Sequence, residues 1–354
     1  MNKIENLIKL MPQDVDAVLV RGQINRFYFT NFDSTEGALI ITKNGAFLLL
    51  DSRYFEMAKN EVKGMEIVCF SNVYEEIKNV FKKNNVKTVA IETKVTSINQ
   101  FKEYEEKFAE FNFRTDTWLD DVILNLRAVK TEEEIEKIKK SQEIVDEAFT
   151  HILKIVGAGK TEKQISREIE SFILDRAQAV SFPSIVVSGK NTSLPHGVPS
   201  NKVIEKGDFV TMDFGALLDG YCSDMTRTVC IGSVSDFQKE LYNTVLKAQE
   251  VALNEIKEGL ICNEVDGHVR EFFKQFGYVE EFGHGLGHGV GLEIHEDPYF
   301  NKICKAKLKE NMVLTVEPGL YLYSKMGLRI EDMVVVKKEG ILNLTKSSKE
   351  LICI

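Results

Sequence analysis

The sequence has few of the features that mark secreted, membrane-spanning or nucleic-acid-binding proteins. Its six cysteines include no Cys-x-x-Cys pair, as expected of reduced thiols. No apolar run reaches membrane-spanning length, and the opening MNKIENLIKL carries charges where a secretory signal has an apolar core. The formal net charge is -9 and no basic stripe is present, which argues against a phosphate-backbone partner. We therefore expect a cytoplasmic protein that binds neither nucleic acid nor a membrane.

The length of 354 residues indicates two domains. Up to about Phe108, short apolar runs alternate with amphipathic helical stretches, which predicts a compact α/β domain. After the single tryptophan, Trp118, the pattern changes to long helices. We place the boundary near Asp121, giving a smaller α/β domain over 1–121 and a second domain over 122–354.

The second domain alternates helices with strand segments such as FVTMDFGA and LRIEDMVVV. This order predicts an α+β domain in which helices cover an antiparallel sheet on one side. Capping boxes mark the starts of two helices, at Thr131 with Glu134 and at Thr161 with Gln164. Later helices are predicted around Asp236–Ile256 and Asn263–Phe276.

Two aspartates lie on a predicted hairpin in this domain. Asp219 and Gly220 stand between two strand-like runs, a strong turn signal. A two-residue loop would pair Asp213 with Thr226, and a four-residue loop would pair it with Asp224; both registers put the two aspartates on one face, roughly 5 to 8 Å apart. Such acids repel unless a cation lies between them, although two solvated aspartates are the alternative.

Two glutamates occupy similarly apolar strands. In LRIEDMVVV the period of two puts Arg329 and Glu331 on one face and Ile330 with Asp332 on the other. Glu317 stands at a strand end, where Pro318 and Gly319 follow it. The alternative for each acid is a surface ion pair.

Histidines cluster beside alternating glycines in FGHGLGHGVGLEIHE. If the segment is extended, one face is bare glycine and lets another backbone approach. The other face then carries the side chains at alternate positions. These are His284, Leu286, His288, Val290 and Leu292, and His295 follows shortly after.

Four carboxylates and an imidazole suit divalent ions such as Mn²⁺, Co²⁺, Fe²⁺ or Zn²⁺. Two such ions would neutralise four carboxylates. A pair of ions about 3.5 to 4 Å apart supplies a hydroxide and polarises a carbonyl, which is the arrangement of metal-assisted hydrolysis.

The motifs MDFGALLDGYCSDMTRT, GHGLGHGVGLEIHE, TVEPGLY and GLRIEDM resemble, in order and spacing, those of the methionine aminopeptidase, aminopeptidase P and prolidase superfamily. The segments SLPHGVPS and DSRYFEMA extend the resemblance to the aminopeptidase P and prolidase branch. The resemblance implies a C-terminal pita-bread domain that binds two divalent ions, with Mn or Co first and Zn or Fe as alternatives.

The resemblance also implies a role for each matching residue. Asp213 would chelate one ion, Asp224 and Glu331 would bridge both, and His288 and Glu317 would complete the second site. Glu317 would also shuttle a proton. Substrate binding or stabilisation of the intermediate would fall to His196, His284, His295 and Arg329. Without the resemblance, the sequence predicts that His196 is an exposed loop histidine and that His295 forms a surface ion pair with Glu296.

The large N-terminal domain favours an Xaa-Pro peptidase over a methionine aminopeptidase. We expect an aminopeptidase P that removes the first residue from short peptides with proline in second position; an Xaa-Pro dipeptidase is the alternative. The pita-bread fold also includes creatine amidinohydrolase and non-catalytic binding proteins, but those relatives have lost metal ligands that this chain keeps. The resemblance further implies a homodimer in which the N-terminal domain limits peptide length.

Overall fold

The computed structural model describes residues 3–354 and divides into two compact units. The first unit ends at Arg127 and the second runs from Ala128 to Ile354. The division therefore falls beyond the boundary predicted at Asp121. The reason is helix α6 (Trp118–Ala128), which runs uninterrupted through that position.

The N-terminal unit is a six-stranded mixed sheet with the order β4-β3-β2-β1-β5-β6. Strands β1, β2 and β3 pair antiparallel, whereas β4, β5 and β6 join in parallel. Its strands are β1 (Ala17–Val20), β2 (Ala38–Thr42), β3 (Gly45–Leu50), β4 (Glu66–Cys69), β5 (Thr88–Ile91) and β6 (Asn112–Arg114). Its other helices are α1 (Lys3–Leu10), α2 (Gln23–Thr30), α3 (Ser52–Glu61), α4 (Val73–Lys83) and α5 (Ile98–Lys107). The predicted α/β class is confirmed.

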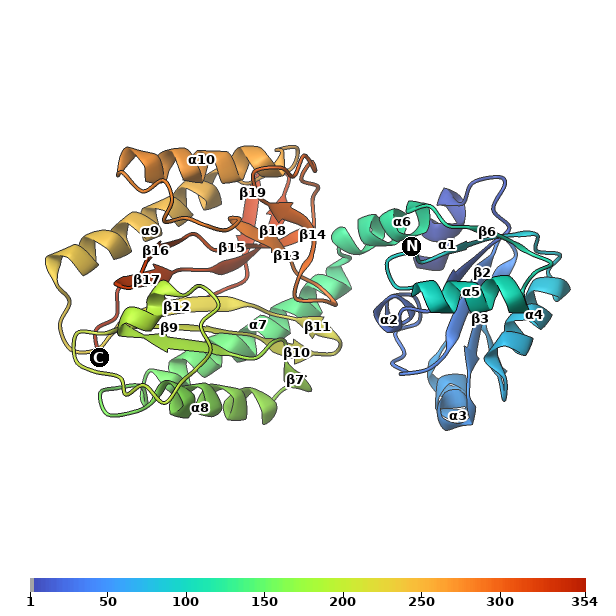
Figure 1. Cartoon of the computed structure of the whole chain (residues 1–354), viewed down its shortest axis with the longest axis horizontal. Helices are drawn as coiled ribbons and strands as arrows, with labels where there is room; N and C mark the ends of the chain where they lie inside the picture. Colours follow the sequence, from blue (N-terminus) through green and yellow to red (C-terminus); the bar gives the residue numbers. More distant parts are fainter. Residues whose placement is uncertain (1–2) are drawn as a thin grey trace. The chain divides into compact units, whose positions relative to one another are not determined.

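Four long helices build the outside of the C-terminal unit. In Figure 1, α7 and α8 lie on one side of the strands and α9 and α10 lie on the other. Both predicted capping boxes are present at the starts of α7 and α8. The helices are α7 (Glu132–Ile152), α8 (Glu162–Leu174), α9 (Asp236–Glu255) and α10 (Cys262–Gln275).

The strands of this unit form antiparallel sheets between the two helix pairs. The principal sheets have the orders β12-β9-β8 and β14-β13-β15-β18-β19, and the smaller ones β11-β10-β7 and β16-β17. The strands are β7 (Ala179–Val180), β8 (Ile185–Ser188), β9 (Phe209–Phe214), β10 (Ala216–Leu218), β11 (Tyr221–Cys222), β12 (Met225–Cys230), β13 (Gly287–Gly289), β14 (Glu296–Phe300), β15 (Val313–Val316), β16 (Gly319–Leu322), β17 (Met326–Arg329), β18 (Asp332–Lys337) and β19 (Gly340–Asn343).

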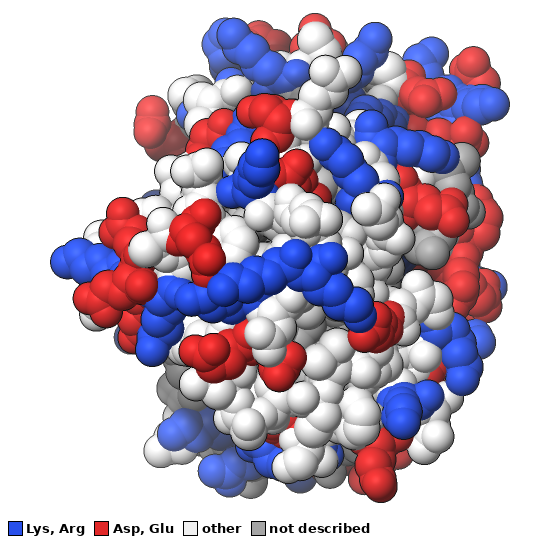
Figure 2. Space-filling model, turned by 90° about the vertical axis from the view of Figure 1, so that its right-hand side faces the viewer, with Lys and Arg blue, Asp and Glu red and all other residues white. Residues whose placement is uncertain are grey.

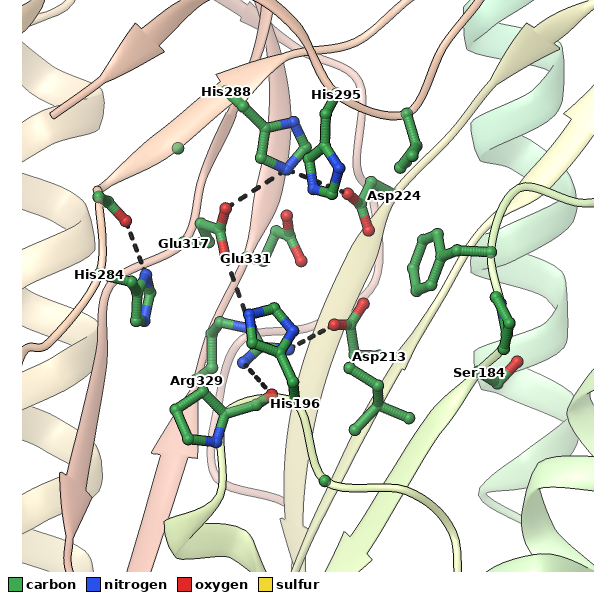
Figure 3. Close-up of a pocket in the computed structure, with 18 of the residues that line it drawn as sticks. Ser184, His196, Asp213, Asp224, His284, His288, His295, Glu317, Arg329 and Glu331 are labelled. Atoms are coloured by element: carbon green, nitrogen blue, oxygen red, sulfur yellow. Dashed lines mark hydrogen bonds and ion pairs between the residues drawn. The ribbon is translucent and has the colours of Figure 1, made fainter.

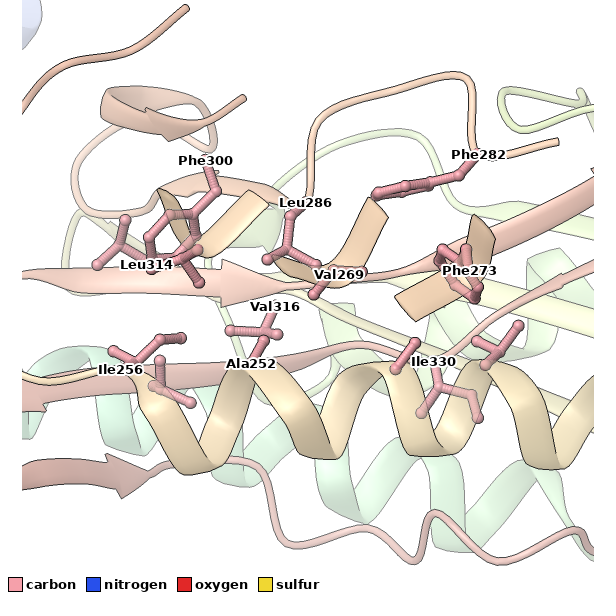
Figure 4. Close-up of a cluster of buried hydrophobic side chains, with 14 of the residues drawn as sticks. Ala252, Ile256, Val269, Phe273, Phe282, Leu286, Phe300, Leu314, Val316 and Ile330 are labelled. Atoms are coloured by element: carbon pink, nitrogen blue, oxygen red, sulfur yellow. The ribbon is translucent and has the colours of Figure 1, made fainter. Parts of the chain in front are cut away.

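Each helix pair buries its own apolar core against one principal sheet. One core joins α7 and α8 to β8, β9 and β12, and includes Met212 and Phe214. The other joins α9 and α10 to β15 and β18, and Figure 4 shows Leu286, Leu314 and Val316 within it. Because successive strand residues point to opposite faces, residues that alternate with these core positions face away from the helices.

Charged side chains of both signs are intermixed on the surface. On the face drawn in Figure 2, a short band of basic side chains is bordered by acidic ones. Among residues 3–354, no helix combines the length and apolarity that crossing a membrane requires. The cytoplasmic location and the absence of a nucleic-acid partner stay predictions.

Candidate metal centre

The hairpin that carries the two aspartates adopts the two-residue-loop register. Asp213 on β9 pairs with Thr226 on β12, and Leu218 pairs with Tyr221. Asp219 and Gly220 form the turn with φ of 50° and 80°, the left-handed values that such a loop requires. Because the neighbours of Asp213 on β9 point into the helix-covered core, the Asp213 side chain points to the opposite face, where it lines a pocket.

The two glutamates stand where regular strand structure is interrupted. Glu317 directly follows β15, as the Pro318-Gly319 signal predicted. Glu331 falls between β17 and β18, so the single continuous strand predicted for LRIEDMVVV is wrong. The alternation of faces nevertheless persists across the break, since Arg329 and Glu331 line the pocket while Ile330 belongs to the core.

The glycine-rich segment allows the close backbone approach that its sequence predicts. A Cβ placed on Gly287 would lie 2.0 Å from the carbonyl oxygen of Thr315, and one on Gly285 would lie 2.6 Å from that of Phe300. The prediction that His284, Leu286 and His288 share one face is wrong, because Leu286 is fully buried in the core beside α10. Only Gly287–Gly289 is regular strand, and a bulge follows at His288, so strict alternation does not hold.

The pocket brings the predicted ligands together in a cavity of about 520 Å³. Ligand atoms of Asp224, His288 and Glu331 all lie within 4.8 Å of one another. The Nε2 atom of His288 is 3.6 Å from Asp224 Oδ2 and 3.4 Å from Glu317 Oε1. Figure 3 shows these side chains converging from different strands, with Asp213 on the same wall as Asp224.

Burial and mutual repulsion shift the pKa values of these groups. The pKa of Glu317 rises to about 8, mainly because the carboxyl is buried. Burial and then the neighbouring acids hold the pKa values of Asp224 and Glu331 well above the usual range. Burial lowers the pKa of His288 to about 3, so its imidazole is neutral at pH 7. Without a cation, the cluster therefore retains protons that a divalent ion displaces.

The donor set fits divalent metal ions. Oδ1 of Asp213 and Oδ1 of Asp224 are buried and have no hydrogen-bond partner among the described residues. The Nδ1 atom of His288 lies 3.1 Å from the Gly289 carbonyl oxygen, which can only accept, so Nδ1 carries the proton and Nε2 offers its lone pair to the pocket. Bound divalent ions would supply a Lewis acid and an activated water at neutral pH.

Arg329 is the buried cation of the site. Its Nη2 donates to Asp213 Oδ2, its Nε lies 3.7 Å from Glu317 Oε2, and its Nη1 donates to the Tyr321 hydroxyl at 2.8 Å. Burial lowers the pKa of Arg329, but Tyr321 and the nearby acids outweigh it and hold the pKa above its usual value. Asp213 is thus paired with a cation from its own chain in the structure, while its second oxygen stays unpartnered.

The remaining predicted histidines also line the pocket. His284 is half-buried, and its Nε2 lies 3.2 Å from the Tyr321 hydroxyl, which places the tyrosine between His284 and Arg329. His295 lies against His288, with ring centroids 4.3 Å apart. The predicted surface pair of His295 with Glu296 is wrong, because Glu296 is buried and lies 3.3 Å from Lys130. His196 is exposed at the pocket wall, as its turn sequence indicated.

Two residues near the site were not predicted. The Thr226 hydroxyl donates to Glu331 Oε2 at 2.7 Å and accepts from Arg329 Nε at 2.9 Å, so it orients both side chains. The hairpin register already placed Thr226 opposite Asp213, which was the available signal. Tyr321 lies on β16, and its hydroxyl accepts from Arg329 Nη1; no local pattern in the sequence marked it.

Fold and site together define a metallopeptidase. The model of metallopeptidase family M24 matches residues 136–338, and that of the creatinase/prolidase N-terminal domain matches residues 3–129. The chain belongs to metallopeptidase family M24. The predicted pita-bread fold with a creatinase-type N-terminal domain is thereby confirmed.

Similar proteins cover the chain almost completely. It is 39% identical over 353 residues to an Xaa-Pro dipeptidase of Pyrococcus furiosus, covering 99% of each chain. Among solved structures, an Xaa-Pro dipeptidase from Bacillus anthracis matches with a TM-score of 0.95 at 40% identity, covering 99% of each chain. An X-Pro aminopeptidase from Thermotoga maritima matches with a TM-score of 0.93 at 38% identity, covering 99% of this chain and 100% of that one.

Proposed function

We propose that this chain is a two-metal Xaa-Pro dipeptidase. The observation that carries the proposal is the buried cluster of Asp224, His288 and Glu331, with Glu317 beside it, at the base of a pocket in a family M24 chain. Relatives named Xaa-Pro dipeptidase favour this activity over the aminopeptidase P expected from the sequence.

We assign the residues as follows. Asp213, Asp224, His288, Glu317 and Glu331 hold two divalent ions, for which Mn²⁺ or Co²⁺ fits the carboxylate-rich donor set. Glu317, which stands beside His288 at the pocket, moves a proton between the attacking water and the departing amine. The imidazoles of His196, His284 and His295, together with Arg329, contact the substrate or the tetrahedral intermediate.

An Xaa-Pro aminopeptidase is the second candidate, and one observation favours it. A dipeptidase must accommodate the carboxylate that follows proline. Arg329 is the only Lys or Arg among the described pocket-lining residues, and its guanidinium already contacts Asp213, Thr226, Tyr321 and the Pro195 carbonyl. A carboxylate site in this pocket would therefore have no further Lys or Arg and would rely on the histidines, the metal ions or neutral donors such as Tyr299 and Asn301.

The two candidates differ in how they treat the carboxylate after proline. The test compares kcat/KM for an Xaa-Pro dipeptide, its C-terminal amide and an Xaa-Pro-Xaa tripeptide with the same first residue. For a dipeptidase we expect the amide and the tripeptide to be cleaved at least about tenfold more slowly, since a hydrogen bond to a charged group contributes about 1.5–3 kcal/mol. Equal or faster cleavage of the tripeptide would instead identify an aminopeptidase.

We also propose a homodimer, following the family resemblance. Sedimentation analysis of a 40.2 kDa chain should then give a particle of twice that mass. A monomer that hydrolyses short peptides normally would contradict this part of the proposal.

A further inference from the structure

A glutamine on helix α9 hydrogen-bonds the backbone beside both glutamates of the metal centre. The side-chain Nε2 of Gln249 donates to the carbonyl oxygen of Val316 at 3.0 Å and to that of Ile330 at 3.3 Å. Val316 immediately precedes Glu317, and Ile330 immediately precedes Glu331. One amide group thus bridges the two segments that carry these carboxylates.

The bridge lies where the ladder between the two segments is interrupted. The β15–β18 pairing ends at Val316 opposite Asp332, and the β16–β17 pairing resumes at Gly319 opposite Arg329. Within this gap, Ile330 N–H donates to the Pro318 carbonyl at a long 3.4 Å.

The backbone amides of the two glutamates do not close the gap. Glu317 N–H donates to the Leu286 carbonyl at 2.8 Å, and Glu331 N–H donates to the Thr226 carbonyl at 3.1 Å. Each glutamate is therefore tied to a different neighbouring segment rather than to the other. Apart from the long hydrogen bond between Ile330 and Pro318, the two hydrogen bonds from Gln249 connect the two segments at this point.

Burying the polar side chain of Gln249 in these apolar surroundings costs free energy of folding. It is fully buried, and its α9 neighbours Ala248 and Ala252 belong to the apolar core. Figure 4 shows Val316 and Ile330 packed beside α9 in this core. Oε1 of Gln249 has no hydrogen-bond partner among the described residues, and burying such an atom costs about 1–3 kcal/mol. The two hydrogen bonds that Nε2 donates are the favourable interactions that offset this cost.

We propose that Gln249 is a positioning residue that fixes the separation of Glu317 and Glu331 and thereby the affinity of the two-metal centre. The inference rests on the proposed function, because it requires that these glutamates bind metal. Gln249 touches neither substrate nor metal and acts only through the two carbonyls. Replacing a residue that orients metal ligands without contacting the metal commonly lowers metal affinity or activity by about 10- to 100-fold.

Gln142 on α7 provides a matched control. It is also a fully buried helical glutamine, but neither its Nε2 nor its Oε1 has a hydrogen-bond partner among the described residues. Replacing it with leucine therefore removes a buried amide without breaking a described hydrogen bond.

The test measures Mn²⁺ binding by calorimetry on metal-free wild type, Gln249→Leu and Gln142→Leu, with melting temperatures taken before and after loading. For Gln249→Leu we expect binding of the shared ions to weaken by about 10- to 100-fold, and the stabilisation by Mn²⁺ to shrink accordingly. At saturating Mn²⁺, kcat should fall while KM changes little. Gln142→Leu should bind Mn²⁺ as the wild type does.

Unchanged Mn²⁺ affinity in a folded Gln249→Leu protein would overturn the inference, as would an equal loss in Gln142→Leu. If the leucine variant does not fold, Gln249→Met, which keeps an unbranched chain and has no donor, is measured in the same way and judged by the same outcomes. A wild-type protein that binds neither Mn²⁺ nor Co²⁺ would instead overturn the metal centre itself, so the two failures are distinguishable.

Discussion

Metal binding should release protons, because the metal-free site holds them at neutral pH. With a pKa of about 8, Glu317 is protonated in about nine-tenths of the metal-free molecules at pH 7. The pKa values of Asp224 and Glu331 are raised as well, by burial and by neighbouring acids. Since a metal ion binds the carboxylate form, Mn²⁺ affinity should rise by at least about tenfold from pH 6 to pH 7 and keep rising until all three carboxyl groups are ionised.

Calorimetry in two buffers of different ionisation enthalpy counts the released protons directly. At pH 7 we expect close to one proton from Glu317 and a further contribution from the other two acids. Glu92 provides the control, because burial also raises its pKa, but it lies in the N-terminal unit and accepts hydrogen bonds from Gly22 and Asn25 there. Glu92→Gln should release the same number of protons as the wild type. Mn²⁺ binding without proton release would refute the reasoning.

Four single substitutions test other contacts in the C-terminal unit. Glu331→Gln should loosen both metal ions, whereas Arg329→Ala should keep metal content nearly intact and lower kcat; metal analysis and steady-state kinetics check both. Arg227→Met should lower the unfolding free energy by about 1.5–3 kcal/mol in urea titration, because it removes a buried 2.7 Å ion pair with Asp332, which keeps Lys349 as its second cation. Gly287→Ala should lower it by at least about 1–3 kcal/mol, because its Cβ would meet a carbonyl oxygen 2.0 Å away.

The local chemistry of the site could be predicted from the sequence because it depends on short-range rules. Turn preference left two hairpin registers open, and the structure adopts the one that pairs Asp213 with Thr226. Glycine spacing correctly indicated close backbone approach at Gly287. Period-two alternation kept Arg329 and Glu331 on the pocket face even though the strand breaks between them.

Features set by contacts between distant segments could not be predicted. The helix that crosses the predicted domain boundary carries no stop signal at Asp121. Leu286 turns into the core because α10 and β15 surround it, which the alternation of glycines does not reveal. The buried bridge from Gln249 joins residues more than sixty positions apart, and no local pattern marks it.

The central claim is that this chain hydrolyses Xaa-Pro peptides with two metal ions. The direct measurement removes metal with a chelator, adds Mn²⁺ or Co²⁺ stepwise, and follows both bound metal and hydrolysis of an Xaa-Pro dipeptide. We expect no activity without metal, and activity that rises to its maximum as two ions bind per chain. A chain that binds no divalent ion, or that cleaves the dipeptide equally well without one, would contradict the claim.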